Sequence, residues 1–341
     1  MKSVAIKGIK EFEIKELVEP TIDGENVIID IIKSGICGSD IHNWEMGGPI
    51  GLVLGHEFCG IVKDPGNRKD LKEGDRVTAL PISPCNDCYA CKSGNPQYCR
   101  QTWAKAVGLS VENPGGLTKT IKVRSDMVIP VPNEMTDEEV AMVEPTAVAL
   151  HAINLANIKE DDKVLVIGAG IIGLSSAMLA KTKTKNLVAV SEANINRAKK
   201  AKDLEVVDKY YDAKSEKFLE EIMIDTKDGF DVVIECCGNA PAVSSAIMAT
   251  KPGGTIVLVG VATEPIAIPT VVAVLNEITM QGAIAYTKEE FEETIDLIKD
   301  KKINVLKFVD EVVGLEDVQK SYEKLTSGES EVIKILVNPN K

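Results

Sequence analysis

The strongest constraint on the fold is a glycine-rich turn that lies directly between an apolar run and a helix-forming run. Residues 164–167 read VLVI and predict a buried strand; GAGIIG follows at 168–173, and a predicted helix covers 174–181. Strands and helices then alternate, which indicates a parallel, doubly wound α/β sheet. The further expected strands are 187–191, 230–235, 255–259 and 279–282, and the further expected helices are 240–249 and 288–299.

The same turn predicts a dinucleotide site. Between a strand and a helix, Gly168 permits the turn, Gly170 lets a pyrophosphate approach the backbone, and Gly173 lets the helix pack on the strand. The helix N-terminus adds free amides and partial positive charge. Loops after later strands should supply the other contacts. The expected cofactor-binding residues are Gly168, Gly170, Ile172, Gly173, Glu192, Arg197, Val259, Gly260, Val261, Ile284 and Ala285.

Glu192 bears on which dinucleotide is bound. It ends a predicted strand 19 residues beyond Gly173, close to the spacing of the acid that binds ribose hydroxyls. A carboxylate there repels a 2′-phosphate, so NAD is favoured over NADP. Arg197, five residues on, weakens that preference, because arginine can face a ribose or a phosphate. The competing interpretation of Glu192 is a solvated loop acid.

Four cysteines predict a closed metal site. Cys85, Cys88, Cys91 and Cys99 form the pattern C-x2-C-x2-C-x7-C, and four thiolates complete the tetrahedral coordination of a structural zinc. An iron–sulfur cluster is the competing interpretation, since cysteines at this spacing also suit iron. The lobe 84–100 has few apolar residues, so the metal should hold its shape.

A second, open metal site is expected earlier in the chain. Cys37 and His56 lie 19 residues apart, each beside a glycine, and Glu57 follows directly. A thiolate, an imidazole and a carboxylate with one position left open are typical of catalytic zinc. Taken alone, Cys37 could be a small buried hydrophobe and His56 a satisfied core histidine.

Three further polar residues belong to this prediction. Ser39 and His42 lie close to Cys37 in the sequence. Ser39 could instead be a turn hydroxyl, and His42 a surface histidine. Glu144 lies in the apolar segment VEPTAVALH, where a carboxylate would be costly to bury without a partner such as a metal cation. The alternative for Glu144 is a helix-capping role.

Size, charge and hydropathy restrict the remaining possibilities. A length of 341 residues suits two domains, and a net charge of −13 argues against a nucleic-acid partner. The uncharged run 164–180 contains three glycines and two serines, which favour a strand, turn and buried helix over a membrane span. We see no signal peptide, and eight cysteines then indicate metal ligation in a reducing compartment. A cytoplasmic protein without a membrane partner is expected.

These motifs, in this order, resemble those of the zinc-dependent medium-chain dehydrogenase/reductase family. The resemblance rests on GHE, the four-cysteine lobe, VEPTAVALH and GAGIIG, and it covers nearly the whole chain. CGSDIH and VEPTAVALH are similar to the polyol branch, which includes sorbitol, butanediol and galactitol-1-phosphate dehydrogenases. The segment between Cys37 and His56 is shorter than in many relatives, so the substrate is not carried over.

The resemblance implies a fold and a set of ligands. It implies a GroES-like, β-rich catalytic domain at 1–147 with 288–341 and a Rossmann domain at 148–287. It also implies two zinc ions per chain. Cys37 and His56 would hold the catalytic ion with Glu57 or Glu144, and the four-cysteine lobe would hold the structural ion. A homodimer or homotetramer is expected, and the final strand, 332–337, should pair with the first domain.

The expected reaction is hydride transfer from a secondary alcohol or polyol to NAD, the substrate being a small molecule, such as a sugar alcohol or its phosphate. Zinc would make an alkoxide accessible near neutral pH. Ser39 would take the proton, which would leave through the cofactor ribose and His42. The alternatives are a 3-hydroxy amino acid dehydrogenase of the L-threonine type, a zinc-independent reductase, and a non-enzymatic NAD-binding protein on the same fold.

Overall fold

The computed structural model describes residues 1–341, which divide into two compact units. Unit 1 contains Met1–Pro145, Thr287–Ser327 and Lys334–Lys341, and unit 2 contains Thr146–Tyr286 and Gly328–Ile333. Helix α4 (Val143–Ala156) begins in unit 1 and continues in unit 2. None of the helices combines the length and the hydrophobicity that a membrane span needs.

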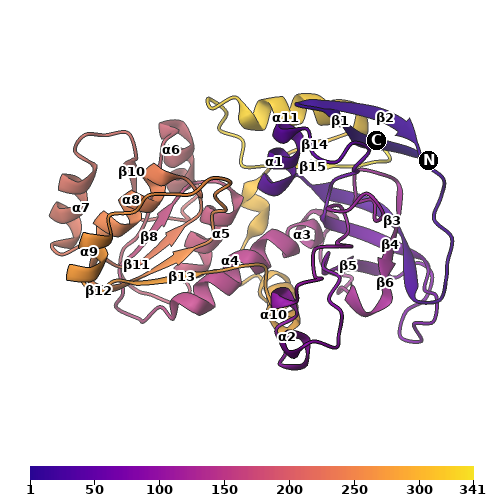
Figure 1. Cartoon of the computed structure of the whole chain (residues 1–341), viewed down its shortest axis with the longest axis horizontal. Coiled ribbons are helices and arrows are strands. Elements are labelled where there is room, and N and C mark those ends of the chain that lie inside the picture. Colours follow the sequence, from indigo (N-terminus) through magenta and orange to yellow (C-terminus); the bar gives the residue numbers. More distant parts are fainter. The chain divides into compact units, whose positions relative to one another are not determined.

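Unit 1 is built on a seven-stranded sheet (Figure 1). The strand order is β14-β15-β3-β4-β5-β7, and β6 also pairs with β3; β1 and β2 form a separate antiparallel pair. Its strands are β1 (Lys2–Gly8), β2 (Glu11–Glu16), β3 (Asn26–Gly35), β4 (Glu57–Asp64), β5 (Arg76–Ala79), β6 (Thr120–Arg124), β7 (Val128–Pro130), β14 (Val309–Val313) and β15 (Lys334–Val337). Its helices are α1 (Gly38–Met46), α2 (Tyr89–Lys92), α3 (Asp137–Ala141), α10 (Lys288–Lys299) and α11 (Val318–Thr326).

The closing strand returns to the start of the chain. β15 pairs antiparallel with β3, with Leu336 opposite Gly35 and Val337 opposite Ser34. The expected pairing of the final strand with the first domain is therefore confirmed. This pairing brings residues from the two ends of the chain into one core, next to the loop that carries Cys37.

Unit 2 is a six-stranded parallel sheet in the order β10-β9-β8-β11-β12-β13. This order reverses direction at β8, as in sheets that bind dinucleotides. Its strands are β8 (Val164–Ile167), β9 (Val188–Glu192), β10 (Lys209–Asp212), β11 (Phe230–Glu235), β12 (Thr250–Leu258) and β13 (Thr279–Gly282). Its helices are α5 (Ile171–Ala180), α6 (Ile195–Asp203), α7 (Phe218–Thr226), α8 (Ala240–Ala249) and α9 (Thr270–Leu275).

The core of unit 2 comes from the apolar runs that predicted its strands. Leu165, Val233 and Ile256 are fully buried in three neighbouring strands, and Ala246 and Ile247 of α8 pack against them. Strands covered by helices read as continuous apolar runs rather than alternating ones. The predicted doubly wound sheet is confirmed.

Three boundaries differ from the sequence expectations. α5 begins at Ile171, three residues earlier than expected, because Gly170 adopts the extended N-cap conformation. No helix was expected between Cys37 and His56, yet this segment contains helix α1. Residues 328–333 group with unit 2, since Asn194 donates hydrogen bonds to the carbonyls of Gly328 and Ser330.

Candidate active site

Three potential metal ligands meet at the end of β3 and the start of β4. Cys37 is the N-cap of α1, His56 directly precedes β4, and Glu57 is the first residue of β4. One ligand atom from each lies within 4.8 Å of the others. His56 and Glu57 are buried and Cys37 is half-buried. The group comes together because β3 and β4 pair antiparallel, with Gly35 opposite Glu57.

Asp40 orients this group, a role that the sequence analysis missed. It is fully buried; Oδ2 accepts a hydrogen bond from the amide of Cys37 at 3.1 Å, and Oδ1 lies 3.3 Å from Nδ1 of His56. Burial alone would lower the pKa of His56, but the negative charges of Asp40 and Cys37 raise it well above its ordinary value. The available signal was an acid three residues after an N-cap, the capping-box position.

Lys334 is the second functional residue that the sequence analysis missed. Its ammonium pairs with Oε2 of Glu57 and donates to the carbonyl of Ile36 at 2.8 Å, and neither charged side chain is exposed. Oε1 of Glu57 has no hydrogen-bond partner. One oxygen of Glu57 is thus neutralised by the ammonium, and the other remains available to the group with Cys37 and His56.

The two expected relay residues lie on α1. The hydroxyl of Ser39 donates to Sγ of Cys37 at 3.3 Å and lies 3.5 Å from Nε2 of His56. His42, three residues further along the same helix, is exposed. Residues three apart share a helix face, so Ser39 and His42 can form a path from the ligand atoms to solvent.

Glu144 and Trp44 have different surroundings. Glu144 is buried in the first turn of α4, and its ligand role stays a prediction. Trp44 is buried against Phe12 and Tyr322, with ring centroids 6.2 and 5.6 Å away. Trp44 is a packing residue of unit 1.

The four cysteines of the lobe form a compact group. One sulfur from each of Cys85, Cys88, Cys91 and Cys99 lies within 4.8 Å of all the others. The Cys88–Cys91 and Cys85–Cys91 sulfur distances are 3.5 and 3.9 Å. A tetrahedral zinc with bonds of about 2.3 Å places its sulfur ligands about 3.8 Å apart. The donor set and its spacing fit a closed zinc site.

Backbone amides in this lobe donate hydrogen bonds to the cysteine sulfurs and so favour the thiolate form that binds a cation. The amide of Cys88 donates to Sγ of Cys85 at 3.3 Å, and the amides of Cys85 and Gln101 donate to Sγ of Cys99 at 3.4 Å. Amides of Asp87 and Cys88 lower the pKa of Cys85 to about 6. Burial and neighbouring thiols instead raise the pKa of Cys91 to about 12. Four thiolates this close together repel one another, so a bound cation is needed to hold all four ionised.

The glycine-rich turn in unit 2 has space on one side and close packing on the other. A side chain at Gly173 would place Cβ 1.9 Å from the carbonyl oxygen of Gly168. Gly168 has a φ of +101°, in the left-handed region. A Cβ at Gly170 would meet nothing within 4 Å. These surroundings are consistent with a turn that packs tightly on the sheet and leaves its outer face open to a pyrophosphate.

Glu192 lies at the edge of this turn. It is buried; Oε2 accepts from the amide of Ala169 at 2.7 Å, and Oε1 accepts from the amide of Asn194 at 2.8 Å. The guanidinium of Arg197 lies 3.1 Å from Oε1. Burial would raise the pKa of Glu192, but Arg197 and the amides lower it. The carboxylate is ionised and fixed, unlike a solvated loop acid.

The other expected cofactor residues follow later strands of the same sheet. Val259 and Gly260 come directly after β12, and both amides donate to the carbonyl of Glu235. A Cβ at Gly260 would lie 2.0 Å from the amide nitrogen of Gly238, so these loops touch. Ile172 is half-buried in α5, Val261 and Ile284 are exposed, and Ala285 is buried with a positive φ.

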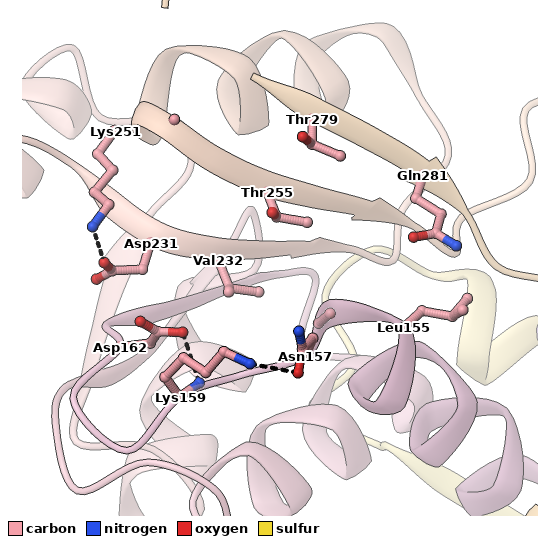
Figure 2. Close-up of a pocket in the computed structure, with 12 residues that line it drawn as sticks. Leu155, Asn157, Lys159, Asp162, Asp231, Val232, Lys251, Thr255, Thr279 and Gln281 are labelled. Atoms are coloured by element: carbon pink, nitrogen blue, oxygen red, sulfur yellow. Dashed lines mark hydrogen bonds and ion pairs between the residues drawn. The ribbon is translucent and has the colours of Figure 1, made fainter. Parts of the chain in front are cut away.

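A pocket of about 350 Å³ lies at the opposite end of these strands (Figure 2). Asp231, Lys251 and Thr279 line it, and each lies near the start of its strand. Lys251 pairs with Asp231. Because dinucleotides bind at the carboxyl ends of parallel strands, this pocket is not assigned to the cofactor.

Comparison with known proteins gives two matches to family profiles. The alcohol dehydrogenase GroES-like domain matches residues 23–133, and the zinc-binding dehydrogenase domain matches residues 172–300. The first match covers the Cys37 group and the four-cysteine lobe. The second covers most of the parallel sheet.

Individual relatives match over nearly the whole chain. D-xylulose reductase A of Aspergillus niger is 30% identical over 98% of this chain and 96% of its own. The structure of 2R,3R-butanediol dehydrogenase from Bacillus subtilis is 28% identical, with a TM-score of 0.87 over 99% of both chains. A Sinorhizobium meliloti protein, described only by its family and bound to NADP, is 26% identical, with a TM-score of 0.89 over 99% of both chains.

Proposed function

Since the chain belongs to the zinc-dependent medium-chain dehydrogenase/reductase family, we propose that it oxidises a secondary alcohol or polyol with NAD. The main observation that supports this proposal is that Cys37, His56 and Glu57 form a group of ligand atoms separate from the closed four-cysteine group. A closed group stabilises the fold, whereas an incomplete group leaves a position for substrate. The named relatives act on D-xylulose, a keto sugar, and on a butanediol, both of which support the substrate class.

We infer that Cys37 and His56 are two ligands of the catalytic ion and that Glu57 or Glu144 completes the set. Oε1 of Glu57 supports the first choice, because it lacks a partner while Oε2 is held by Lys334. Asp40 would hold the His56 imidazole with Nε2 turned toward the ion. Zinc, when bound, lowers the pKa of an oxygen ligand and makes an alkoxide accessible near neutral pH.

Ser39 and His42 would move the proton. The hydroxyl of Ser39, beside Cys37 and His56, can accept the proton of a substrate hydroxyl that enters this group. His42 is exposed and can release the proton to solvent. The nicotinamide, when bound, accepts the hydride, and the chain supplies position and charge.

We propose NAD rather than NADP as the dinucleotide. The ionised Glu192 accepts two backbone amides and pairs with Arg197, so the nearest arginine is already neutralised. A 2′-phosphate beside this carboxylate would be repelled. Glu192→Gln should narrow the NAD-over-NADP preference in kcat/KM. An unchanged ratio would contradict this assignment.

We propose that two copies pair through the edge strand β13. Thr279, Met280, Gln281 and Gly282 carry no charge, proline or bulge that would protect an edge. The adjacent α9 exposes Val274 and Leu275, 73% and 78% exposed. Leu275→Lys should convert a dimer into a monomer in sedimentation experiments, because Leu275 is exposed and lies outside the core of unit 2. An unchanged mass would exclude this edge.

Cys37→Ser tests the proposed function. The expected results are a fall from two zinc ions per chain to one, loss of NADH formation with a panel of diols, polyols and sugar alcohol phosphates, and unchanged NADH affinity. Cys59→Ser is the control, because Cys59 is buried outside both groups and should leave the zinc content at two. Full activity in Cys37→Ser would overturn the proposal. Activity restricted to 3-hydroxy amino acids would favour the L-threonine-type alternative.

A further inference from the structure

The hydroxyl of Tyr322 is buried without a hydrogen-bond partner. Tyr322 lies on α11, in the C-terminal part of unit 1, and its side chain is fully buried. Its OH makes no hydrogen bond within the protein. An unsatisfied buried hydroxyl is costly, so such groups in native proteins nearly always bind a protein atom or an ordered water.

The ring that packs against Tyr322 carries a second unpartnered donor. The Tyr322 ring packs against Trp44 of α1, with centroids 5.6 Å apart, and edge-on against Phe12 at 4.8 Å. Nε1 of Trp44 is also buried without a partner. Two buried rings from different helices therefore pack together, and each carries a donor without a partner in the chain.

A buried acceptor lies on the same face of α1. Asp40 and Trp44 are the two buried residues of that helix, and residues four apart share one face. Oδ1 of Asp40, near Nδ1 of His56, lacks an aligned hydrogen bond. Burial and the charge of Asp40, ahead of those of Cys37 and Glu57, raise the pKa of Tyr322 well above its ordinary value.

We propose that Tyr322 is a positioning residue for the catalytic metal site and acts through a trapped water that it shares with Trp44 and Asp40. The water accepts hydrogen bonds from the Tyr322 hydroxyl and Trp44 Nε1 and donates one to Oδ1 of Asp40. Three hydrogen bonds are typical of a buried water. The carboxylate is then held against Nδ1 of His56. This proposal rests on the proposed binding of zinc by His56.

Tyr322→Phe removes the hydroxyl and keeps the ring contacts. We expect zinc to pass from the Cys37–His56 site to a competing chelator about tenfold faster, the lower end of the effect of losing a supporting hydrogen bond. The four-cysteine site should release its zinc at the wild-type rate. Tyr211→Phe is the matched control. It also deletes the hydroxyl of a buried tyrosine, which donates to Asp225 in unit 2, and should leave both release rates unchanged.

A double-mutant cycle tests whether Tyr322 acts through Asp40. Asp40→Asn should speed zinc release by itself, and adding Tyr322→Phe should change the rate no further. Independent, multiplying effects would overturn the proposal, as would wild-type release in Tyr322→Phe or an equal acceleration in Tyr211→Phe. A wild-type protein that holds only one zinc, in the four-cysteine lobe, would instead refute the proposed function itself.

Discussion

The ammonium of Lys334 lies against the carboxylate of Glu57 in the interior of unit 1, and neither side chain is exposed. The two residues are 277 positions apart in the chain and meet because β15 pairs with β3 beside β4. A Cβ at Gly35 would overlap Oε2 of Glu57, so this pair also explains the glycine before Cys37. The pair fixes one oxygen of a candidate metal ligand and leaves the other available.

Lys334→Met should destabilise unit 1 by about 3–5 kcal/mol, because it leaves the Glu57 carboxylate buried without a partner. Urea unfolding followed by tryptophan fluorescence measures this, since Trp44 and Trp103, the two tryptophans, both lie in unit 1. Lys2→Met, which breaks an exposed pair with Glu316, is the control and should cause no measurable change. An equally small loss of unfolding free energy in both variants would show that the buried pair does not stabilise unit 1 more than an exposed pair does.

The two glycines of the turn should separate cofactor binding from folding. Gly170→Ala meets no atom within 4 Å, so the melting temperature should be unchanged while the new methyl group hinders the pyrophosphate. Gly173→Ala forces Cβ against the carbonyl of Gly168 and should lower both stability and affinity. NADH fluorescence titration should show a Kd raised at least tenfold in both variants. Wild-type NADH affinity in Gly170→Ala would place the dinucleotide elsewhere.

Cys85→Ser should remove the structural zinc and leave the catalytic one. The lobe 84–100 has little apolar surface to hold it together, so the metal supplies its folding free energy. Metal analysis should give one zinc per chain, and limited proteolysis should cut within the lobe. Uncut protein with two bound zinc ions would contradict the assignment of these four cysteines.

The Tyr211–Asp225 hydrogen bond, 2.7 Å long, should make stability depend on pH at both extremes. Burial, and then Asp225, raise the pKa of Tyr211, so its contribution is complete below about pH 10 and is lost as the pH rises. Burial would raise the pKa of Asp225, but Lys209 and Tyr211 lower it, so its contribution is complete above about pH 4 and is lost on acidification.

Calorimetry of wild type and Tyr211→Phe from pH 3 to pH 11 measures this. The difference in stability between the two proteins should be constant from about pH 5 to pH 9 and should shrink outside that window. A difference that stays constant across the whole range would show that the hydrogen bond does not respond to either titration.

Features that depend on local spacing were predictable from the sequence. The strand, glycine turn and helix at 164–180 lie within one short segment, and the confirmed sheet follows from the alternation of such segments. The four cysteines lie within 15 residues, so turns alone bring their sulfurs together. Cys37 and His56 were recognised because the chain has few cysteines and histidines that lie next to a glycine.

The tertiary structure alone decided which groups surround those ligands. Helix α1 was missed because glycines lie on both sides of it, and its only buried residues are one aspartate, Asp40, and one tryptophan, Trp44, so it has no apolar face to recognise. The role of Asp40 depends on β4 bringing His56 beside it, and that of Lys334 depends on a strand contributed by the end of the chain. Surface lysines and buried ones look alike in a sequence. The amino-acid sequence therefore determined the types of metal ligand and their local order. Burial and long-range strand pairing determined which charged side chains contact those ligands.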